Sequence, residues 1–154
     1  MNAPALHTQL TRYDDPVVRC LEDKVQAEYV VRYGGPDRTP VVVDEFDPPA
    51  GAFLVGWVGD EAVACGGFRA HGPDAEVKRM FVPVEYRGHG YARRLLAELE
   101  QLAGEAGYRR VILETGTAQP EAIALYGSAG YLPIPGFGHY RSSPHNRCFA
   151  KILP

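Results

Sequence analysis

The chain has 154 residues, of which 45% are hydrophobic, and its formal net charge is −3 with both signs interspersed along the sequence. A chain of this length can bury one large core, so we expect a single domain over residues 1–154. The charge balance argues against a nucleic-acid binder, which normally presents a basic face. No apolar run approaches the roughly 18 residues of a membrane span. Together with three cysteines at no metal-like spacing, this indicates a cytoplasmic protein without a membrane partner.

The first third of the chain predicts an edge strand, a helix and a long loop. The segment up to Leu10 has the pattern of a short strand at the edge of a sheet. Asp15 before Pro16 indicates the start of a helix over residues 16–32, because an aspartate cap and a proline in the first turn both favour helix initiation. Four prolines in residues 36–51 then predict a loop. This loop, with a possible short strand at 41–43, is either a surface connection or a lid over a binding site.

Three strands follow in succession. Residues 52–58 and 61–69 are apolar and are joined by a Gly-Asp turn, which predicts a hairpin. The Gly66-Gly67 pair inside the second strand predicts a bulge or a close backbone approach. Residues 76–82 form the third strand, which Pro83 ends because proline cannot donate to a strand ladder.

Strict alternation along the third strand places Glu76 on one face and its neighbours on the other. We expect Met80 and Val82 on the same face as Glu76. Val77 and Phe81 are expected together on the opposite face, and Arg79 is also expected to point away from Glu76.

A glycine-rich turn at residues 87–92 leads directly into a long amphipathic helix. The first N–H groups of a helix lack internal partners, and the helix dipole adds about half a positive charge there. Gly88 and Gly90 keep side chains away, so a phosphate can approach these N–H groups, and Arg87 supplies a cation. The turn therefore predicts an anion site suited to a pyrophosphate. The apolar stripe of the helix comprises Ala92, Leu95, Leu96, Leu99, Leu102, Ala103 and Ala106.

Two common phosphate-binding patterns are excluded at this turn. A dinucleotide fingerprint requires G-x-G-x-x-G, and Arg93 occupies the third glycine position. A Walker loop requires G-K-[ST], which the chain does not contain.

The last third of the chain alternates strands and a helix. Residues 110–115 predict a strand, and a helix starts at Gln119-Pro120 and ends before Gly130. Residues 131–134 and 147–153 predict a closing strand pair. Strands that alternate with helices indicate a mixed α/β sheet with helices on both faces.

The pattern R-x-x-G-x-A at Arg87, Gly90 and Ala92 resembles the acetyl-CoA-binding motif of the GNAT superfamily of N-acetyltransferases, [QR]-x-x-G-x-[GA]. A second family motif, N-x-x-A-x-x-L-Y-x-x-x-G-[FY], matches residues 119–131 at every position except the first, where Gln119 replaces Asn. The resemblance extends over residues 52–134. It implies the GNAT fold, a mixed and mostly antiparallel sheet of about six to seven strands with a splayed cleft between its central strands.

The resemblance also implies acetyl-CoA as the co-substrate and no metal. The pantetheine arm would bond to the backbone of Met80, Phe81 and Val82, as an added half-strand would. Gln119 would either contact the pantetheine arm or serve only as a helix cap. The pyrophosphate would lie over the N–H groups of the glycine-rich turn, with Arg87 beside it; this turn comprises Gly88, His89, Gly90, Tyr91 and Ala92.

Two residues are predicted to be catalytic. Tyr126 matches the family tyrosine beside the CoA sulfur, where a phenol can protonate a departing thiolate; the alternative is a core aromatic. Glu76 occupies the position of the general base in many relatives. Lys78 on the same strand face could pair with Glu76 and hold its pKa low, which would weaken a base. Glu114, near the end of the next strand, is the rival base, and a water is the third option.

The acceptor is expected to be a primary amine of a small molecule, attacked without an acetyl-enzyme intermediate. Arg69 and Arg141 would suit a carboxylate on such an acceptor and Glu114 would suit its amine, unless each is a surface residue. A protein lysine or N-terminus is the alternative acceptor, and a non-catalytic acetyl-CoA sensor is the alternative function. A homodimer is left open. We reject a metal site, because three histidines have no standard ligand spacing. They are His89, His139 and His145.

Overall fold

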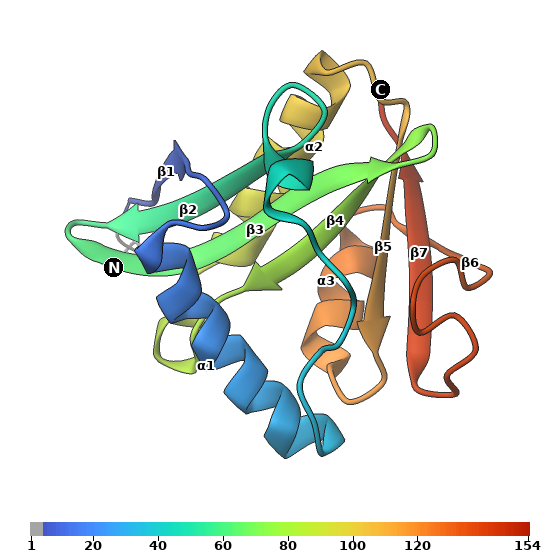
Figure 1. Ribbon diagram of the computed structural model, residues 1–154, viewed down its shortest axis with the longest axis horizontal. Helices are drawn as coiled ribbons and strands as arrows, with labels where there is room; N and C mark the ends of the chain where they lie inside the picture. The colour runs from blue at the N-terminus through green and yellow to red at the C-terminus, as the bar shows by residue number, and fades with distance from the viewer. Residues whose placement is uncertain (1–4) are drawn as a thin grey trace.

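A seven-stranded sheet with the order β1-β2-β3-β4-β5-β7-β6 forms the centre of the protein (Figure 1). The computed structural model describes residues 5–154. Every neighbouring pair of strands is antiparallel except β4 and β5, which are parallel. The predicted mixed, mostly antiparallel sheet is therefore confirmed. The strands are β1 (His7–Leu10), β2 (Ala52–Val58), β3 (Glu61–His71), β4 (Asp74–Phe81), β5 (Arg110–Gly116), β6 (Leu132–Ile134) and β7 (Asn146–Ile152).

Helices cover both faces of the sheet, as predicted (Figure 1). Helix α1 (Pro16–Tyr33) lies on one face, and α2 (Tyr91–Glu105) and α3 (Pro120–Ser128) lie on the other. The start of α1 follows the sequence signal, because the Asp15 carboxylate accepts a hydrogen bond from the Val17 N–H at 2.9 Å. Its end is set by Gly34 in the left-handed conformation, with φ of 78°. No helix in residues 5–154 has the length and apolar content needed to cross a membrane.

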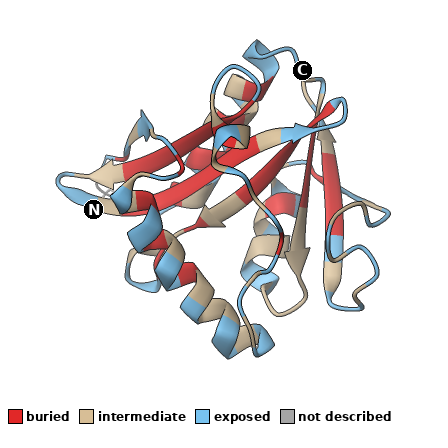
Figure 2. Ribbon diagram, viewed as in Figure 1, coloured by how far each residue is buried: buried red, intermediate tan, exposed pale blue. Residues whose placement is uncertain are grey.

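Two hydrophobic clusters hold these layers together, one on each face of the sheet (Figure 2). The larger cluster packs Leu95 and Leu99 of α2 and Tyr126 of α3 against the sheet. The smaller one packs α1 against the opposite face through Val18, Leu21 and Val25. The sheet thus has apolar residues on both sides, and its polar site must lie where the strands separate.

The expected strand at residues 41–43 is wrong. A short 3-10 helix, η1 (Val43–Phe46), forms instead, and it buries the Phe46 ring to 1% exposure against Phe53 at a centroid distance of 5.5 Å. The Val42 N–H donates to the Glu45 side chain at 3.0 Å. Because the backbone finds this partner locally, it does not join a strand ladder. Cys20 is a second departure from expectation, since it is exposed whereas Cys65 and Cys148 are buried.

Strand β4 contains a bulge at Arg79, which has a left-handed φ of 62°. The register against β3 runs from Lys78 opposite Gly67 to Phe81 opposite Cys65, so β4 has one extra residue there. The extra residue lies in β4, opposite Gly66-Gly67, so of the two predicted alternatives for this glycine pair the close backbone approach is the one found. A Cβ on Gly67 would come within 2.6 Å of the Ala52 carbonyl oxygen, which explains the need for glycine.

The bulge overturns the expected alternation at the end of β4. Val77 joins the cluster under α2, whereas Phe81 joins the cluster under α1, so these two side chains point to opposite faces. Arg79 also turns to the α1 side of the sheet, where it forms ion pairs with Glu22 and Asp37. The extra residue shifts every later side chain to the other face, which strict alternation cannot anticipate.

Strands β4 and β5 pair over only two positions, Ala75 with Val111 and Glu76 with Ile112. Beyond these positions the two strands diverge, and neither has a partner strand on its inner edge within the described residues (Figure 1). The predicted splay between the central strands is confirmed.

Candidate functional site

A pocket of about 460 Å³ lies where β4 and β5 diverge. Its floor comes from the two strands, and its walls come from the end of α1, the loop that follows it and the segment before β7. A polar cavity at this place is the consequence of the missing strand pairing. Residues that line the pocket include Tyr29, Tyr33, Asp37, Thr39, Lys78, Glu114, Tyr140, His145 and Asn146.

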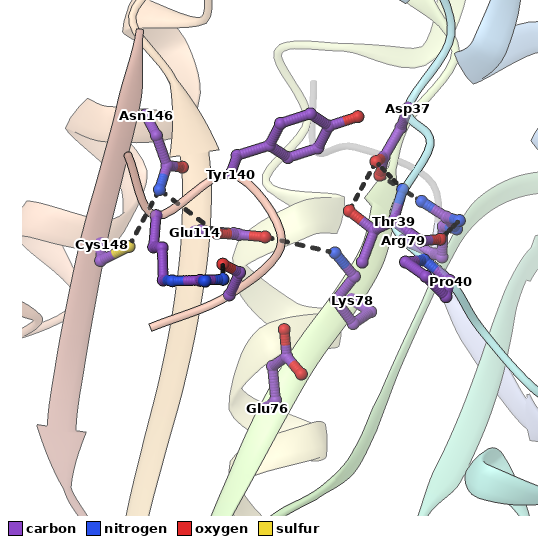
Figure 3. Close-up of polar contacts among 12 residues, drawn as sticks. Asp37, Thr39, Pro40, Glu76, Lys78, Arg79, Glu114, Tyr140, Asn146 and Cys148 are labelled. Atoms are coloured by element: carbon purple, nitrogen blue, oxygen red, sulfur yellow. Dashed lines mark hydrogen bonds and ion pairs between the residues drawn. The ribbon is translucent and has the colours of Figure 1, made fainter. Parts of the chain in front are cut away.

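Lys78 and Glu114 face one another across the floor of the pocket (Figure 3). The Lys78 Nζ lies 3.8 Å from the Glu114 Oε1, and the two side chains are 6% and 5% exposed. The Glu114 Oε1 is fully buried without a hydrogen-bond partner among the described residues, while Oε2 accepts from the Asn146 amide at 3.3 Å. Burial raises the pKa of Glu114, although Lys78 opposes the rise. Burial lowers the pKa of Lys78, although nearby carboxylates oppose that change.

Asp37 joins the loop after α1 to this pocket. Its carboxylate accepts from the Thr39 N–H at 2.9 Å and from the Thr39 hydroxyl at 2.7 Å, and it forms an ion pair with Arg79. Burial alone would raise the pKa of Asp37, but the positive charges of Lys78 and Arg79 and the hydrogen bonds from Thr39 together lower it. The Tyr140 hydroxyl accepts from the Arg38 N–H at 2.7 Å, which ties the segment before β7 to the same loop.

Glu76 and Arg69 are paired with each other and do not line the pocket. The Glu76 carboxylate is 1% exposed and accepts from the Arg69 Nε at 3.0 Å, across the register of β3 and β4. Arg69 also donates to the Pro40 carbonyl at 2.7 Å and pairs with Glu45 at 3.2 Å. The expected pair between Lys78 and Glu76 is therefore absent, because Arg69 takes the Glu76 carboxylate and Lys78 faces Glu114.

The three predicted acceptor residues are not brought together. Only Glu114 lines the pocket, since Arg69 is engaged elsewhere and Arg141 is exposed, with its side chain on the Gly138 carbonyl at 3.4 Å. His145 lines the pocket, and the ring of His139 lies against Tyr140 at 4.7 Å.

The glycine-rich turn has the geometry expected of an anion site. Gly88 and Gly90 have φ values of 87° and 79°, and a Cβ on either would meet no atom within 4 Å, so the space before α2 is open. Gly90 is the N-cap of α2. Arg87 is fastened to the protein, because its Nε donates to the Val82 carbonyl at 2.8 Å and its guanidinium pairs with Glu28 at 2.7 Å.

The backbone beside this turn fits an extended ligand. Residues 77–81 of β4 have no partner strand on the side that faces β5. Met80 and Val82 are half-buried and Phe81 is buried. An unpaired strand edge can bond to an extended chain laid beside it. The unpaired backbone edge at Met80, Phe81 and Val82 is thus compatible with the predicted position of the pantetheine arm.

Tyr126, on α3, lies in the larger hydrophobic cluster and is not among the residues that line the pocket. It is 7% exposed and packs against Tyr131 at 5.8 Å and Phe149 at 6.5 Å. Burial raises the pKa of Tyr126 to about 12, so the phenol keeps its proton at neutral pH. Burial raises the pKa of Tyr29, in the pocket wall, and the nearby Tyr126 adds to this rise.

Gln119 occupies the N-cap position of α3, but its side chain does not cap the helix. The amide oxygen instead accepts from the Tyr33 hydroxyl at 3.2 Å and from the Thr115 hydroxyl at 3.4 Å. The interpretation of Gln119 as a helix cap only is therefore wrong for its side chain, which lies at the pocket wall.

A chain of ion pairs joins α1 to both sides of the divergence. Glu28 pairs with Arg87 at 2.7 Å and with Arg32 at 2.9 Å. Arg32 continues to Glu121 on α3 at 2.6 Å and donates to the Ala118 carbonyl at 2.7 Å. Helix α1 is thus held between the glycine-rich turn and the start of α3.

The chain belongs to the GNAT family of acetyltransferases, since the model described as Acetyltransferase (GNAT) family matches residues 20–131. It is accordingly an N-acetyltransferase. An IAA acetyltransferase of Azospirillum brasilense is 40% identical over 103 residues, which cover 66% of this chain and 67% of the relative.

Solved structures show the same fold. The putative acyl-CoA N-acyltransferase of Klebsiella pneumoniae has a TM-score of 0.83 at 25% identity, with 97% of this chain and 98% of that chain covered. A GNAT family acetyltransferase of Elizabethkingia anophelis, solved with acetyl-CoA bound, has a TM-score of 0.69 at 12% identity, with 96% and 98% covered. The predicted family and fold are confirmed.

Sequence reasoning missed several residues that form the pocket. The strand pattern indicates Lys78 only as a partner of Glu76, because the two alternate onto one face. In the structure Lys78 lines the pocket, whereas Glu76 pairs with Arg69. Asp37 lies in a loop and Asn146 is the first residue of β7, so neither position is marked by a hydrophobic period. Only the three-dimensional structure shows that these segments meet.

We expect Asp37→Asn to destabilise the fold in a pH-dependent way. The pKa of Asp37 is lowered in the folded state, so its charge stabilises the fold above the ordinary aspartate pKa of about 3.9, and this contribution is lost as the pH falls through the lower folded pKa. The free energy of unfolding should drop by about 1–3 kcal/mol at pH 7. Urea unfolding at pH 7 and at pH 3 measures it. Exposed Asp23→Asn is the control, and a loss of equal size at both pH values would contradict the prediction.

Proposed function

We propose that the chain transfers the acetyl group of acetyl-CoA to the primary amine of a small molecule held in the pocket between β4 and β5. The observation that carries the proposal is the buried Glu114 Oε1 at the floor of this pocket, which has no hydrogen-bond partner among the described residues. A pocket of about 460 Å³ has the size of a small-ligand site. The 40% identical relative that is named an IAA acetyltransferase supports an acceptor of low molecular weight.

The co-substrate site follows from the backbone. Residues 88–92 would hold the pyrophosphate through the N–H groups at the start of α2, where the dipole favours an anion. Arg87 would position the turn through Glu28 and the Val82 carbonyl, and it would add positive charge beside the phosphates. The unpaired edge of β4 at residues 80–82 would bond to the pantetheine arm.

We propose Glu114 as the general base in preference to Glu76. The acceptor amine arrives as an ammonium and must lose a proton before it attacks. Glu114 has a free buried oxygen that faces the pocket and a raised pKa, both of which suit a base. The Glu76 carboxylate is already bonded to Arg69 and lies outside the pocket.

The reaction balances with two protein groups. Glu114 takes the proton of the ammonium, the amine nitrogen forms a bond to the acetyl carbon, and the bond from that carbon to sulfur breaks. Tyr126 donates its phenolic proton to the departing thiolate, and the second proton leaves the nitrogen of the new amide and restores the phenol. Glu114 then releases the first proton to solvent. The Tyr126 pKa of about 12 keeps the phenolic proton in place until the thiolate forms.

Gly90→Val is expected to abolish acetyl-CoA binding, because the valine side chain would fill the open space before α2. Valine is also strained at a φ of 79°, so Gly59→Val, at a φ of 58° in the hairpin between β2 and β3, is the matched control. Calorimetric titration with acetyl-CoA should detect binding to the control and none to Gly90→Val. Equal affinity in the two variants would refute the anion site.

Glu114→Gln is expected to lower kcat by about 10²-fold or more, the usual contribution of a general base. The wild-type rate should fall as acid protonates Glu114, at a pH above the ordinary glutamate range because its pKa is raised. Glu76→Gln is the comparison, since that carboxylate is buried with Arg69. The pH–rate profiles of the three proteins decide the base: a lost acid limb in Glu76→Gln and a normal one in Glu114→Gln would return that role to Glu76.

Tyr126→Phe is expected to lower turnover by about 10²-fold with little change in acetyl-CoA affinity, because only the hydroxyl is removed from a packed ring. Release of free thiol measures turnover, and calorimetry measures affinity. Tyr131→Phe removes a neighbouring hydroxyl that bonds to Glu100 at 2.7 Å and serves as the control. Wild-type turnover in Tyr126→Phe would make Tyr126 a core residue only.

A further inference from the structure

Lys78 is a buried cation that the proposed mechanism does not use. Its side chain is 6% exposed and lines the pocket, and within residues 5–154 its ammonium makes no hydrogen bond. The nearest carboxylate oxygen is Glu114 Oε1, at 3.8 Å, which is beyond hydrogen-bond distance. The Lys78 ammonium opens onto the pocket, so its donors are free to bond to a group that enters there.

The other acidic groups near Lys78 are already engaged. The Glu76 carboxylate accepts from Arg69, and the Asp37 carboxylate accepts from Thr39 and pairs with Arg79. Neither carboxylate accepts a hydrogen bond from the Lys78 ammonium. The donors of Lys78 therefore remain available to an acceptor that enters the pocket from outside.

Lys78 and Glu114 together present two opposite and incompletely satisfied groups to one space (Figure 3). The Glu114 Oε1 can accept from an ammonium, and the Lys78 Nζ can donate to a carboxylate. Both side chains are more than nine-tenths buried, so water competes weakly with a ligand that satisfies them. A molecule that carries an amine and a carboxylate on the same carbon satisfies both groups at once.

Simple amines and polyamines fit this space less well. A ligand with positive charge only would place it next to Lys78, and the like charges would repel. The charged residues that line the pocket are balanced, with Asp37 and Glu114 against Lys78 and Arg38, so no excess of negative charge favours a polycation. The rings of Tyr29, Tyr33 and Tyr140 also line the pocket and offer apolar surface to a ligand side chain.

We propose that the acceptor is a free α-amino acid, whose carboxylate accepts hydrogen bonds from Lys78 while its amino group faces Glu114. The proposal rests on the proposed function, because it assigns a substrate class to the same pocket. Lys78 is the residue that selects the carboxylate. Glu114 remains the group that removes the proton from the amine.

The test compares three acceptors that differ at one group: phenylalanine, phenylalaninamide and phenethylamine. Leucine, leucinamide and isoamylamine form a second set. Free-thiol release gives kcat and KM for wild type, for Lys78→Met and for Lys24→Met, which removes an exposed lysine on α1 as the control. Circular dichroism and acetyl-CoA titration first establish that each variant is folded.

In at least one set, wild type should use the amino acid with a kcat/KM at least tenfold above that of the amide and the amine. Lys78→Met should remove this preference by raising KM for the amino acid at least tenfold more than KM for the amine. The kcat values are compared separately, because loss of the Lys78 charge also raises the pKa of Glu114 for every acceptor. Lys24→Met should keep the preference. The wild-type comparison needs no variant, so it decides the proposal even if Lys78→Met does not fold.

Three results would overturn the proposal. Equal or better use of the amide and the amine in both sets would show that the carboxylate is not recognised, while acetylation of these free amines would leave the proposed function intact. An equal loss for all acceptors in Lys78→Met would make Lys78 a positioning residue for Glu114. If the protein acetylated peptides but none of the small free amines, both the inference and the proposed function would be refuted.

Discussion

The parallel pairing of β4 and β5 ends after two residue pairs, and the site depends on this early separation. Past Glu76, the inner edges of both strands have backbone polar groups without a strand partner, and such groups need other partners. One edge is therefore available to an extended ligand. The space between the edges receives the side chains of Lys78 and Glu114, one from each strand. A fully paired sheet at this position would have closed the pocket.

The bulge at Arg79 connects this gap to the layer that contains α1. The extra residue turns Arg79 toward Asp37 and Phe81 toward the cluster under α1. The loop after α1 is thereby drawn against β4, and the ion pairs from Glu28 hold α1 itself between the glycine-rich turn and α3. Helix α1 thus contacts both the turn that precedes α2 and the pocket between β4 and β5.

Two buried carboxylates on neighbouring strands differ in how completely their oxygens are bonded. Glu76 is bonded to Arg69, which is itself bonded to a carbonyl and to Glu45, so this network is satisfied and rigid. Glu114 has one oxygen held by Asn146 and one without a partner. The free oxygen, the raised pKa and the pocket all occur at Glu114. Burial alone does not distinguish Glu76 from Glu114, because both side chains are buried.

The sequence by itself determined the family, the order of strands and helices and the glycine-rich turn, because these depend on local spacing: Gly88 and Gly90 before an amphipathic helix, and Tyr126 within a second motif. It could not show the 3-10 turn at Phe46 or the face of Phe81, since one inserted residue at Arg79 reverses the alternation. Only the tertiary structure decided that Arg69 forms an ion pair with Glu76 and that Lys78 lies opposite Glu114. Those partners are set by register and by strand divergence, which bring together residues far apart in the chain.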